Sequence, residues 1–179
     1  DIVPKITEIE SKTFESCWEL HTVHLPLYLQ SIGKEAFYYC LALKKIDFYN
    51  CSKLEVIEEK AFDSCKSLQE INLNSSQVLR KIGISAFKDC KRLQRVTLHN
   101  FVDFGPVLEV GHKAFIGCMD NLEVIIGRRG EDTVKNVWIK EQWSPDSFLR
   151  MPHGLKETFP KNTQFFKWVN KKRRRFGLD

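Results

Sequence analysis

The sequence lacks the features that most directly identify a membrane-spanning chain or an enzyme. It contains no run of about 18 apolar residues, so we expect no transmembrane helix. Gly-rich phosphate-binding, dinucleotide-binding and Gly-x-Ser-x-Gly nucleophile motifs are absent, and none of the five histidines forms a metal-binding i, i+4 pair. We therefore expect a protein that is not an enzyme, with no catalytic residues, no cofactor and no metal. Only His21 and His24, three residues apart, leave catalysis open.

The beginning of the chain carries no basic-then-apolar leader, and it opens at Asp1 without a methionine. We expect a processed fragment that is monomeric or belongs to a longer chain. The net charge of +5 is unevenly distributed, because residues 1–127 carry 15 Lys and Arg against 17 Asp and Glu. Residues 128–179 carry 13 against 6, so the basic excess lies in this last segment.

The sequence does contain an internal repeat. Five copies share an apolar residue, then Ala or Thr followed by Phe, then Cys three residues after the Phe. The phenylalanines are 23, 25, 25 and 28 residues apart, in or near the range of about 20–29 residues that is typical of leucine-rich repeats. They are Phe14, Phe37, Phe62, Phe87 and Phe115.

Each repeat cysteine is followed by the pattern Leu-x-x-Ile/Val-x-Leu/Phe in the first four copies. Alternate residues of a strand point to opposite faces, so the apolar residues are expected inside and their neighbours outside. Curved solenoids bind partners through such faces, although a merely solvated surface is the alternative. Only Arg95 is of a type enriched in interface hot spots. The candidate partner-binding face comprises Thr22, His24, Lys45, Asp47, Glu70, Asn72, Arg95 and Thr97.

A second, shorter apolar ladder precedes each Phe in the later copies. Gly33, Gly83 and Gly111 each follow the last residue of such a ladder, where we expect a sharp turn that uses positive φ. The turn does not strictly need glycine, because Glu10 and Glu58 replace it in the other copies. The Ala-Phe pair is expected in a short helical turn that packs the ring inward. One copy cannot close a core, so the copies must stack and bury a continuous one.

The unit Ile-Gly-x-x-Ala-Phe-x-x-Cys-x-x-Leu-x-x-Ile-x-Leu resembles the BspA-like (Treponema-type) leucine-rich repeat over about residues 6–127. The resemblance implies an α/β leucine-rich-repeat solenoid, a β-rich right-handed coil of five short repeats with short helical turns. It also implies a recognition role, since such proteins are associated with adhesion and protein binding. It supplies no catalytic residues. Variable repeat length and the non-repetitive last third depart from the family pattern, which leaves partner and location open.

Five of the six cysteines occupy one repeat column, where we expect small buried side chains with free thiols. Their spacing does not suit zinc, and equivalent positions of stacked repeats point the same way, which is poor disulfide geometry. Cys51 lies outside the column and is expected to be exposed. Free thiols favour an intracellular location, cytoplasmic or nuclear, over a secreted one. The column comprises Cys17, Cys40, Cys65, Cys90 and Cys118.

The last third, residues 128–179, contains seven aromatic residues within about thirty, from Trp138 to Trp168, which is too many for a disordered tail. We expect a solenoid cap there, with a partner-binding surface as the alternative. A helix is expected over residues 162–172. The insertion 99–106, with Phe101 and Phe104, is a candidate contact loop, unless its rings fold back onto the core.

A basic tail begins at the end of that predicted helix. Such a cluster suits a nuclear localisation signal or phosphate binding, and a solvated tail is the alternative. It comprises Lys171, Lys172, Arg173, Arg174 and Arg175.

Three functions remain open from the sequence. The first is a non-catalytic scaffold for protein–protein recognition, with another protein as the partner. The second is binding of nucleic acid or an anionic surface through the basic tail. The third is a structural end-piece of a longer repeat array, which predicts an exposed apolar edge around Val3, Ile6 and Ile9.

Overall fold

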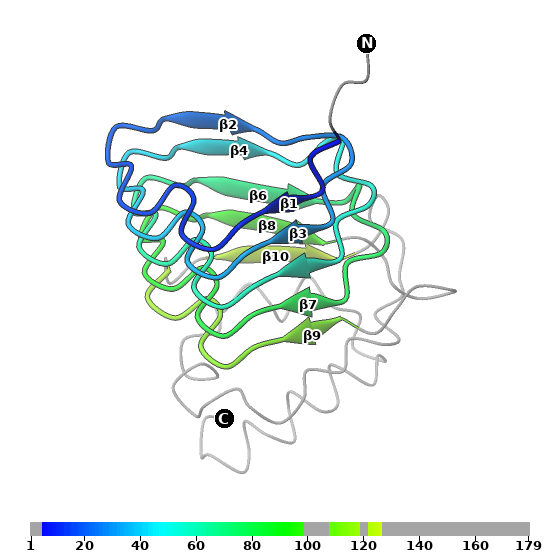
Figure 1. The fold of residues 1–179 in the computed structure, drawn as a ribbon. Helices are drawn as coiled ribbons and strands as arrows, with labels where there is room; N and C mark the ends of the chain where they lie inside the picture. The colour runs from blue at the N-terminus through cyan, green and yellow to red at the C-terminus, as the bar shows by residue number, and fades with distance from the viewer. Residues whose placement is uncertain (1–4, 99–107, 119–121, 127–179) are drawn as a thin grey trace, which may run out of the picture.

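The computed structural model describes residues 5–98, 108–118 and 122–126, and in these the chain forms a solenoid of stacked coils (Figure 1). Each coil contributes one short strand to one parallel sheet and one longer strand to a second parallel sheet. The short strands are β1 (Glu8–Ile9), β3 (Ser31–Ile32), β5 (Val56–Ile57), β7 (Lys81–Ile82) and β9 (Glu109–Val110). The longer strands are β2 (Thr22–His24), β4 (Lys45–Asp47), β6 (Glu70–Leu73), β8 (Arg95–Leu98) and β10 (Glu123–Ile126).

The predicted repeat is the structural repeat. Strands pair in the order β1-β3-β5-β7-β9 and β10-β8-β6-β4-β2, so consecutive coils are always neighbours. The pairing register keeps equivalent positions opposite each other, as Glu70 opposite Arg95 illustrates. The prediction of a leucine-rich-repeat solenoid rich in β structure is therefore confirmed.

The repeat phenylalanines form one continuous stack through the core. Adjacent rings lie 5.0, 5.0, 5.1 and 5.3 Å apart between centroids, with interplanar angles of 13° or less. This spacing follows that of neighbouring strands, roughly 4.8 Å, because each coil adds one ring at the same position. Phe37, Phe62 and Phe87 are fully buried, whereas Phe14 of the first coil is partly exposed.

The segments that carry the Ala-Phe pairs, called turn segments here (residues 10–17, 33–40, 58–65, 83–90 and 111–118), contain no helix in the described residues. The predicted short helical turns are therefore not found. A helix satisfies its backbone internally, but here only alternate N–H groups bond within the segment. The Ala36 N–H donates back to the Gly33 carbonyl at 3.2 Å, whereas the Phe37 N–H donates to Ala61 of the next coil at 2.8 Å.

The backbone of the turn segments also explains why no helix forms. Two residues of every turn segment, four positions apart, have positive φ, and left-handed residues interrupt a right-handed helix. The positions are Lys12, Ser16, Glu35, Tyr39, Lys60, Ser64, Ser85, Asp89, Lys113 and Gly117.

The prediction that Gly33, Gly83 and Gly111 use positive φ is wrong, because none of them does. The constraint is instead the close approach of the preceding coil. A Cβ on Gly33 would lie 2.7 Å from the Ser11 backbone nitrogen, and one on Gly83 would lie 2.5 Å from the Glu58 carbonyl carbon. These glycines let two backbones touch where the coils turn.

The cysteine column forms a ladder of thiol hydrogen bonds. The Cys40 Sγ donates to the Phe14 carbonyl oxygen at 3.0 Å, and the next three column cysteines repeat this contact one coil further on, each at 3.2 Å. Burial raises the pKa of the Cys40 thiol to about 11 and that of Cys118 to about 12. The buried, free thiols expected from the sequence are confirmed for Cys40, Cys65 and Cys90.

Two cysteines are the reverse of what the sequence predicts. Cys51, expected to be exposed, is fully buried, while Cys17 of the column is exposed. Cys51 lies in a second inward column, where its carbonyl accepts a hydrogen bond from the buried Ser76 hydroxyl at 3.1 Å. Cys17 belongs to the first described coil, so no preceding described coil covers its side chain.

The N-terminal edge only partly matches the end-piece prediction. Ile6 is 55% exposed, but Ile9 is buried because β1 pairs with β3 and turns this side chain into the core. Val3 lies outside the described residues. So do the insertion 99–106, the predicted cap 128–179, the predicted helix 162–172 and the basic tail, and these remain predictions.

Candidate partner-binding face

The outward side chains of the longer strands form one surface, called the long-strand face here and defined by the eight residues predicted from the sequence. In β6 the exposed Glu70 and Asn72 alternate with the buried Ile71 and Leu73. Six of the eight residues are exposed and two, Asp47 and Thr97, are half-buried. The predicted outward orientation is therefore confirmed, and partner binding stays a prediction.

The parallel register joins these side chains into rows that cross the coils. Glu70 lies between Lys45 and Arg95, because β6 pairs with both β4 and β8. The Arg95 Nη1 and Glu70 Oε2 atoms are 3.9 Å apart, and the His24 Nδ1 and Asp47 Oδ2 atoms are also 3.9 Å apart. Both pairs are exposed or half-buried, so each contributes little to stability, about 0–1 kcal/mol, and both stay accessible to a partner.

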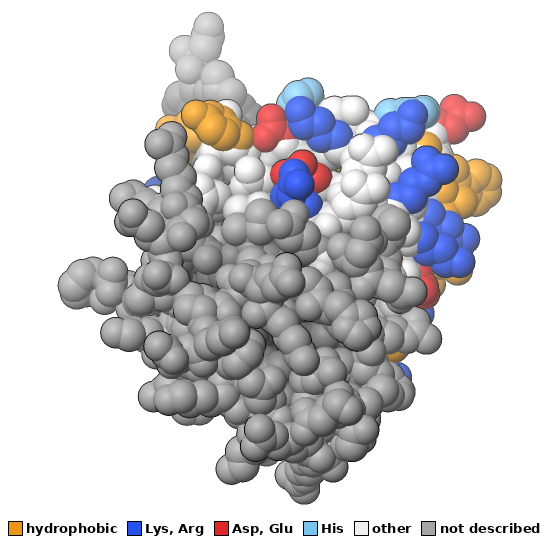
Figure 2. Space-filling view, turned by 180° about the vertical axis from the view of Figure 1, so that it is seen from behind, with side chains coloured by type: hydrophobic (Ala, Val, Ile, Leu, Met, Phe, Trp, Pro, Cys, Tyr) orange, Lys and Arg blue, Asp and Glu red, His pale blue; other side chains and the backbone are white. Residues whose placement is uncertain are grey.

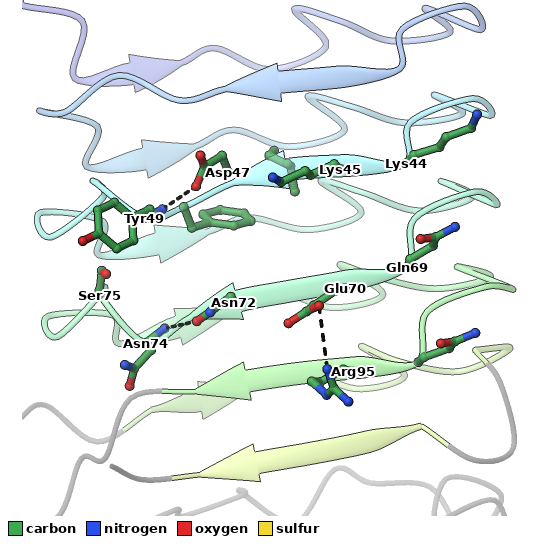
Figure 3. A pocket seen from close by; sticks show the side chains of 13 residues that line it. Lys44, Lys45, Asp47, Tyr49, Gln69, Glu70, Asn72, Asn74, Ser75 and Arg95 are labelled. Atoms are coloured by element: carbon green, nitrogen blue, oxygen red, sulfur yellow. Dashed lines mark hydrogen bonds and ion pairs between the residues drawn. The ribbon is translucent and has the colours of Figure 1, made fainter. Parts of the chain in front are cut away.

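A hollow of about 560 Å³ opens on this face across three neighbouring coils (Figure 3). Thr22, His24 and Thr97 are not part of its lining, whereas the other five predicted residues are. The lining comprises Lys44, Lys45, Ile46, Asp47, Phe48, Tyr49, Gln69, Glu70, Asn72, Asn74, Ser75, Gln94 and Arg95.

The rim of the hollow is formed by turns at the carboxyl ends of β4 and β6. The Asp47 Oδ1 accepts a hydrogen bond from the Tyr49 N–H at 2.9 Å, and the Asn72 Oδ1 accepts one from the Asn74 N–H at 3.1 Å. Figure 3 shows both bonds at equivalent places in adjacent coils. Such Asx turns fix the backbone locally, so Asp47 and Asn72 both line the hollow and shape its rim.

Tyr49 is the most exposed aromatic residue among the lining residues that the sequence-based prediction of the face did not include. Its side chain is 77% exposed at the rim of the hollow, and tyrosine is a favoured interface residue. A signal was present in the spacing, because the second and third phenylalanine steps are two residues longer than the first. The extra residues lie in these rim turns. Contacts between coils align Pro26, Cys51 and Ser76: the Ser76 hydroxyl donates to the Cys51 carbonyl, and the Cys51 Sγ lies 4.0 Å from the Pro26 carbonyl oxygen.

The chemistry of the face suits hydrogen bonding rather than catalysis. Amide side chains at Gln69, Asn72 and Gln94 offer both donors and acceptors in neighbouring coils. His21, part of the sequence-based catalytic alternative, has its Nδ1 2.6 Å from the Glu19 carbonyl oxygen. Among the described residues no group of three or more His, Cys, Asp or Glu side chains is placed to hold a metal ion.

No helix in the described part of the chain is long and apolar enough to cross a membrane.

A search of curated proteins found none that matches the chain. Residues 1–123 match the family model of the BspA type leucine rich repeat region, which counts six copies, one more than the five phenylalanine-centred repeats described here.

Several solved structures are similar to this chain. A leucine-rich repeat protein from Bacteroides ovatus is 25% identical with a TM-score of 0.55, and the match covers 70% of this chain but only 30% of that protein. The pneumococcal vaccine antigen PcpA is 23% identical with a TM-score of 0.52, covering 90% of this chain and 38% of the antigen. A T. pallidum leucine-rich repeat protein is 27% identical with a TM-score of 0.42, covering 69% and 74%.

The family match extends over well more than half of the chain, and its repeat is the one that builds the coils and stacks their phenylalanines. The chain belongs to the BspA-type leucine-rich repeat family.

Proposed function

We propose that this chain is a non-catalytic scaffold that recognises another protein through the long-strand face. The observation that carries the proposal is the hollow, which draws its lining from three adjacent coils and includes five of the eight residues predicted from the sequence. Its length across the coils suits an extended segment of a protein partner. The mixture of charges, amides and one exposed tyrosine matches the polar composition of non-obligate interfaces.

The stacked core supports this role because it holds the face in one arrangement. The phenylalanine stack and the thiol ladder run behind the sheet through every described coil. A partner that binds a preformed surface loses less conformational entropy than one that must order it. The proposal therefore expects the long-strand face to keep its shape when the partner binds.

The test is a pull-down from cell lysate with the full chain and a double variant of the face, Tyr49→Ala with Arg95→Glu. The matched control is Tyr39→Ala with Arg80→Glu, because Tyr39 and Arg80 are also exposed and Arg80 is also paired with a glutamate, Glu55, at 3.2 Å. We expect the face variant to lose the captured proteins and the control to keep them. Equal capture by both variants would rule out this face as the binding site.

The basic tail supports a second candidate, binding of nucleic acid or an anionic surface. Its support is the charge distribution, with 13 Lys and Arg against 6 Asp and Glu in residues 128–179. A chain that ends at Asn170 lacks Lys171 to Arg175 and is compared with the full chain at low and moderate salt. Capture of RNA or DNA that needs the tail and falls steeply with salt identifies this candidate, since phosphate binding releases counterions.

We propose an intracellular location for the chain, on the support of the free thiols. Cys40, Cys51, Cys65 and Cys90 are buried without forming disulfides, as suits a reducing compartment. Microscopy of the tagged protein in its own cells tests this proposal. A signal confined to the medium or the cell surface would overturn it.

A further inference from the structure

Lysines and arginines without an ion pair gather on one flank of the solenoid. Among the described residues, seven of the fifteen Lys and Arg pair with a carboxylate and eight do not. Five of those eight lie where the chain runs from a column cysteine into β4, β6 or β8. We call these five the basic edge: Lys44, Lys45, Lys66, Lys91 and Arg92.

The basic edge extends over three consecutive coils. All five side chains are exposed. Figure 2, seen from behind the view of Figure 1, shows Lys and Arg side chains in blue along the right-hand edge of the described part of the solenoid. Lys66 and Lys91 follow Cys65 and Cys90 directly, so they occupy the same position in adjacent coils. With strands roughly 4.8 Å apart, three coils place these charges within about 10 Å along the stack.

Charges on the turn segments are arranged differently. Glu35 lies between Lys12 and Lys60, at 3.4 and 3.5 Å, so that neighbouring coils attract each other there. On the basic edge, Glu70 lies opposite Lys45 but is paired with Arg95. Lys66 and Lys91 carry like charges at the same position of neighbouring coils. These charges repel each other, and an anionic partner would relieve that repulsion.

We propose that the basic edge binds an acidic, extended peptide segment of the protein partner. This inference rests on the proposed function and names the chemistry of the partner. The charged length of about 10 Å corresponds to roughly three residues of extended chain. Gln69 and Gln94 border the edge on the hollow side, where their amides match the N–H and C=O groups of a peptide backbone.

The experiment measures fluorescence anisotropy of labelled decaglutamate with the full chain at low salt, with decaglutamine as the neutral peptide. The test variant is Lys66→Glu with Lys91→Glu. The control is Lys53→Glu with Lys113→Glu, which changes the net charge equally at two exposed lysines that also lack an ion pair in the described structure. Every variant keeps residues 171–175. The difference in decaglutamate affinity between the test variant and the control variant therefore reports on the basic edge.

We expect the test variant to weaken decaglutamate binding by about tenfold and the control by less than about twofold. Carbodiimide coupling of the bound peptide, mapped by mass spectrometry, is a second readout that separates the edge from the tail. Lys44, Lys66 and Lys91 are expected to couple ahead of Lys53 and Lys113. Circular dichroism of each variant checks that the solenoid is intact.

The inference would be overturned by equal losses in the two double variants, by no preference for decaglutamate over decaglutamine, or by coupling confined to the tail. Tighter binding of a ten-nucleotide oligothymidine through the same lysines would identify nucleic acid instead and would also overturn it. If decaglutamate fails but lysate proteins are still captured through Tyr49 and Arg95, only the acidic-segment inference falls. If decaglutamate binds at the edge but the face variant captures normally, the proposed role of the face falls instead.

Discussion

The first coil and the third coil carry the same sequence pattern in different surroundings. Phe62 of the third coil stacks between two rings, at 5.0 and 5.1 Å, whereas Phe14 of the first coil stacks on one. Cys65 is fully buried, while Cys17 at the same repeat position is exposed. The comparison shows that a repeat residue acquires its burial from the coils on either side, so stability is a property of neighbours.

The largest expected effect comes from the phenylalanine stack. Phe62→Ala removes a fully buried ring that also contacts Phe48 edge-on at 6.3 Å, and we expect a loss of about 3–5 kcal/mol in the free energy of unfolding. Phe14→Ala should cost roughly half as much or less, because the ring is partly exposed and has one stacked neighbour. Urea unfolding of both variants measures this, and equal losses would contradict the neighbour model.

The glycine position allows a second test of the same comparison. Gly83→Ala places a Cβ about 2.5 Å from the Glu58 backbone, so a whole coil must shift, and we expect a loss of about 1–3 kcal/mol. Glu10 occupies the equivalent position in the first coil and is exposed. Glu10→Ala should change the free energy of unfolding by less than about 0.5 kcal/mol. Thermal unfolding compares the pair, and a harmless Gly83→Ala would show that the close approach is easily relieved.

Thiol reactivity gives a third test without any substitution. We expect iodoacetamide at pH 8 to label the exposed Cys17 in the native protein, since its thiol is accessible. Burial raises the pKa of Cys51 to about 11, so its thiolate is about a hundredfold scarcer than in an ordinary thiol, and the side chain is also covered. Mass spectrometry of timed samples ranks the sites. Native labelling of Cys51 as fast as Cys17 would contradict its buried position.

The smallest expected effect concerns a buried carboxyl of the third coil. Burial raises the pKa of Asp63, and the Ser64 hydroxyl and Lys88 partly offset this. A carboxyl whose pKa is higher in the folded state contributes stability below its unfolded pKa, and that contribution is lost as pH rises through the folded pKa. Asp63→Asn removes this dependence, so the variant should gain stability relative to the original chain as pH rises from about 3 towards neutrality.

The control for that prediction is Glu15→Gln, at the equivalent position in the first coil. The Glu15 side chain is 34% exposed, against 4% for Asp63. Chemical unfolding across this pH range measures both variants. The prediction fails if Asp63→Asn becomes less stable relative to the original chain as pH rises. That result would show that the attraction of Lys88, and not burial, dominates the pKa of Asp63.

Much of the fold could be predicted because the copies of a repeat can be aligned with each other within one sequence. The recurrence of Phe14, Phe37 and Phe62 with a cysteine three residues later identified both the period and the buried columns. Strand alternation then predicted the outward position of Glu70 and Asn72, which the structure confirms. The residues of the face followed from the same alternation.

Other features escaped prediction because they depend on contacts between coils. Tyr49 lines the hollow only because two extra residues form a turn at the end of β4. Cys51 is buried because a second column runs through the core beside the main one. Partner binding by the face, the cap over residues 128–179 and the basic tail remain predictions.

The sequence by itself determined the period of the solenoid, most of the residues that enter its core and the outward side chains of its long strands, because these follow from local spacing and strand alternation. Only the tertiary structure decided how the turn segments fold and why three of them start with glycine. Alternate N–H groups there bond to the next coil, and the backbones of adjacent coils come too close for a Cβ at Gly33 and Gly83. Both effects arise from a neighbouring coil, which no single repeat of the sequence contains.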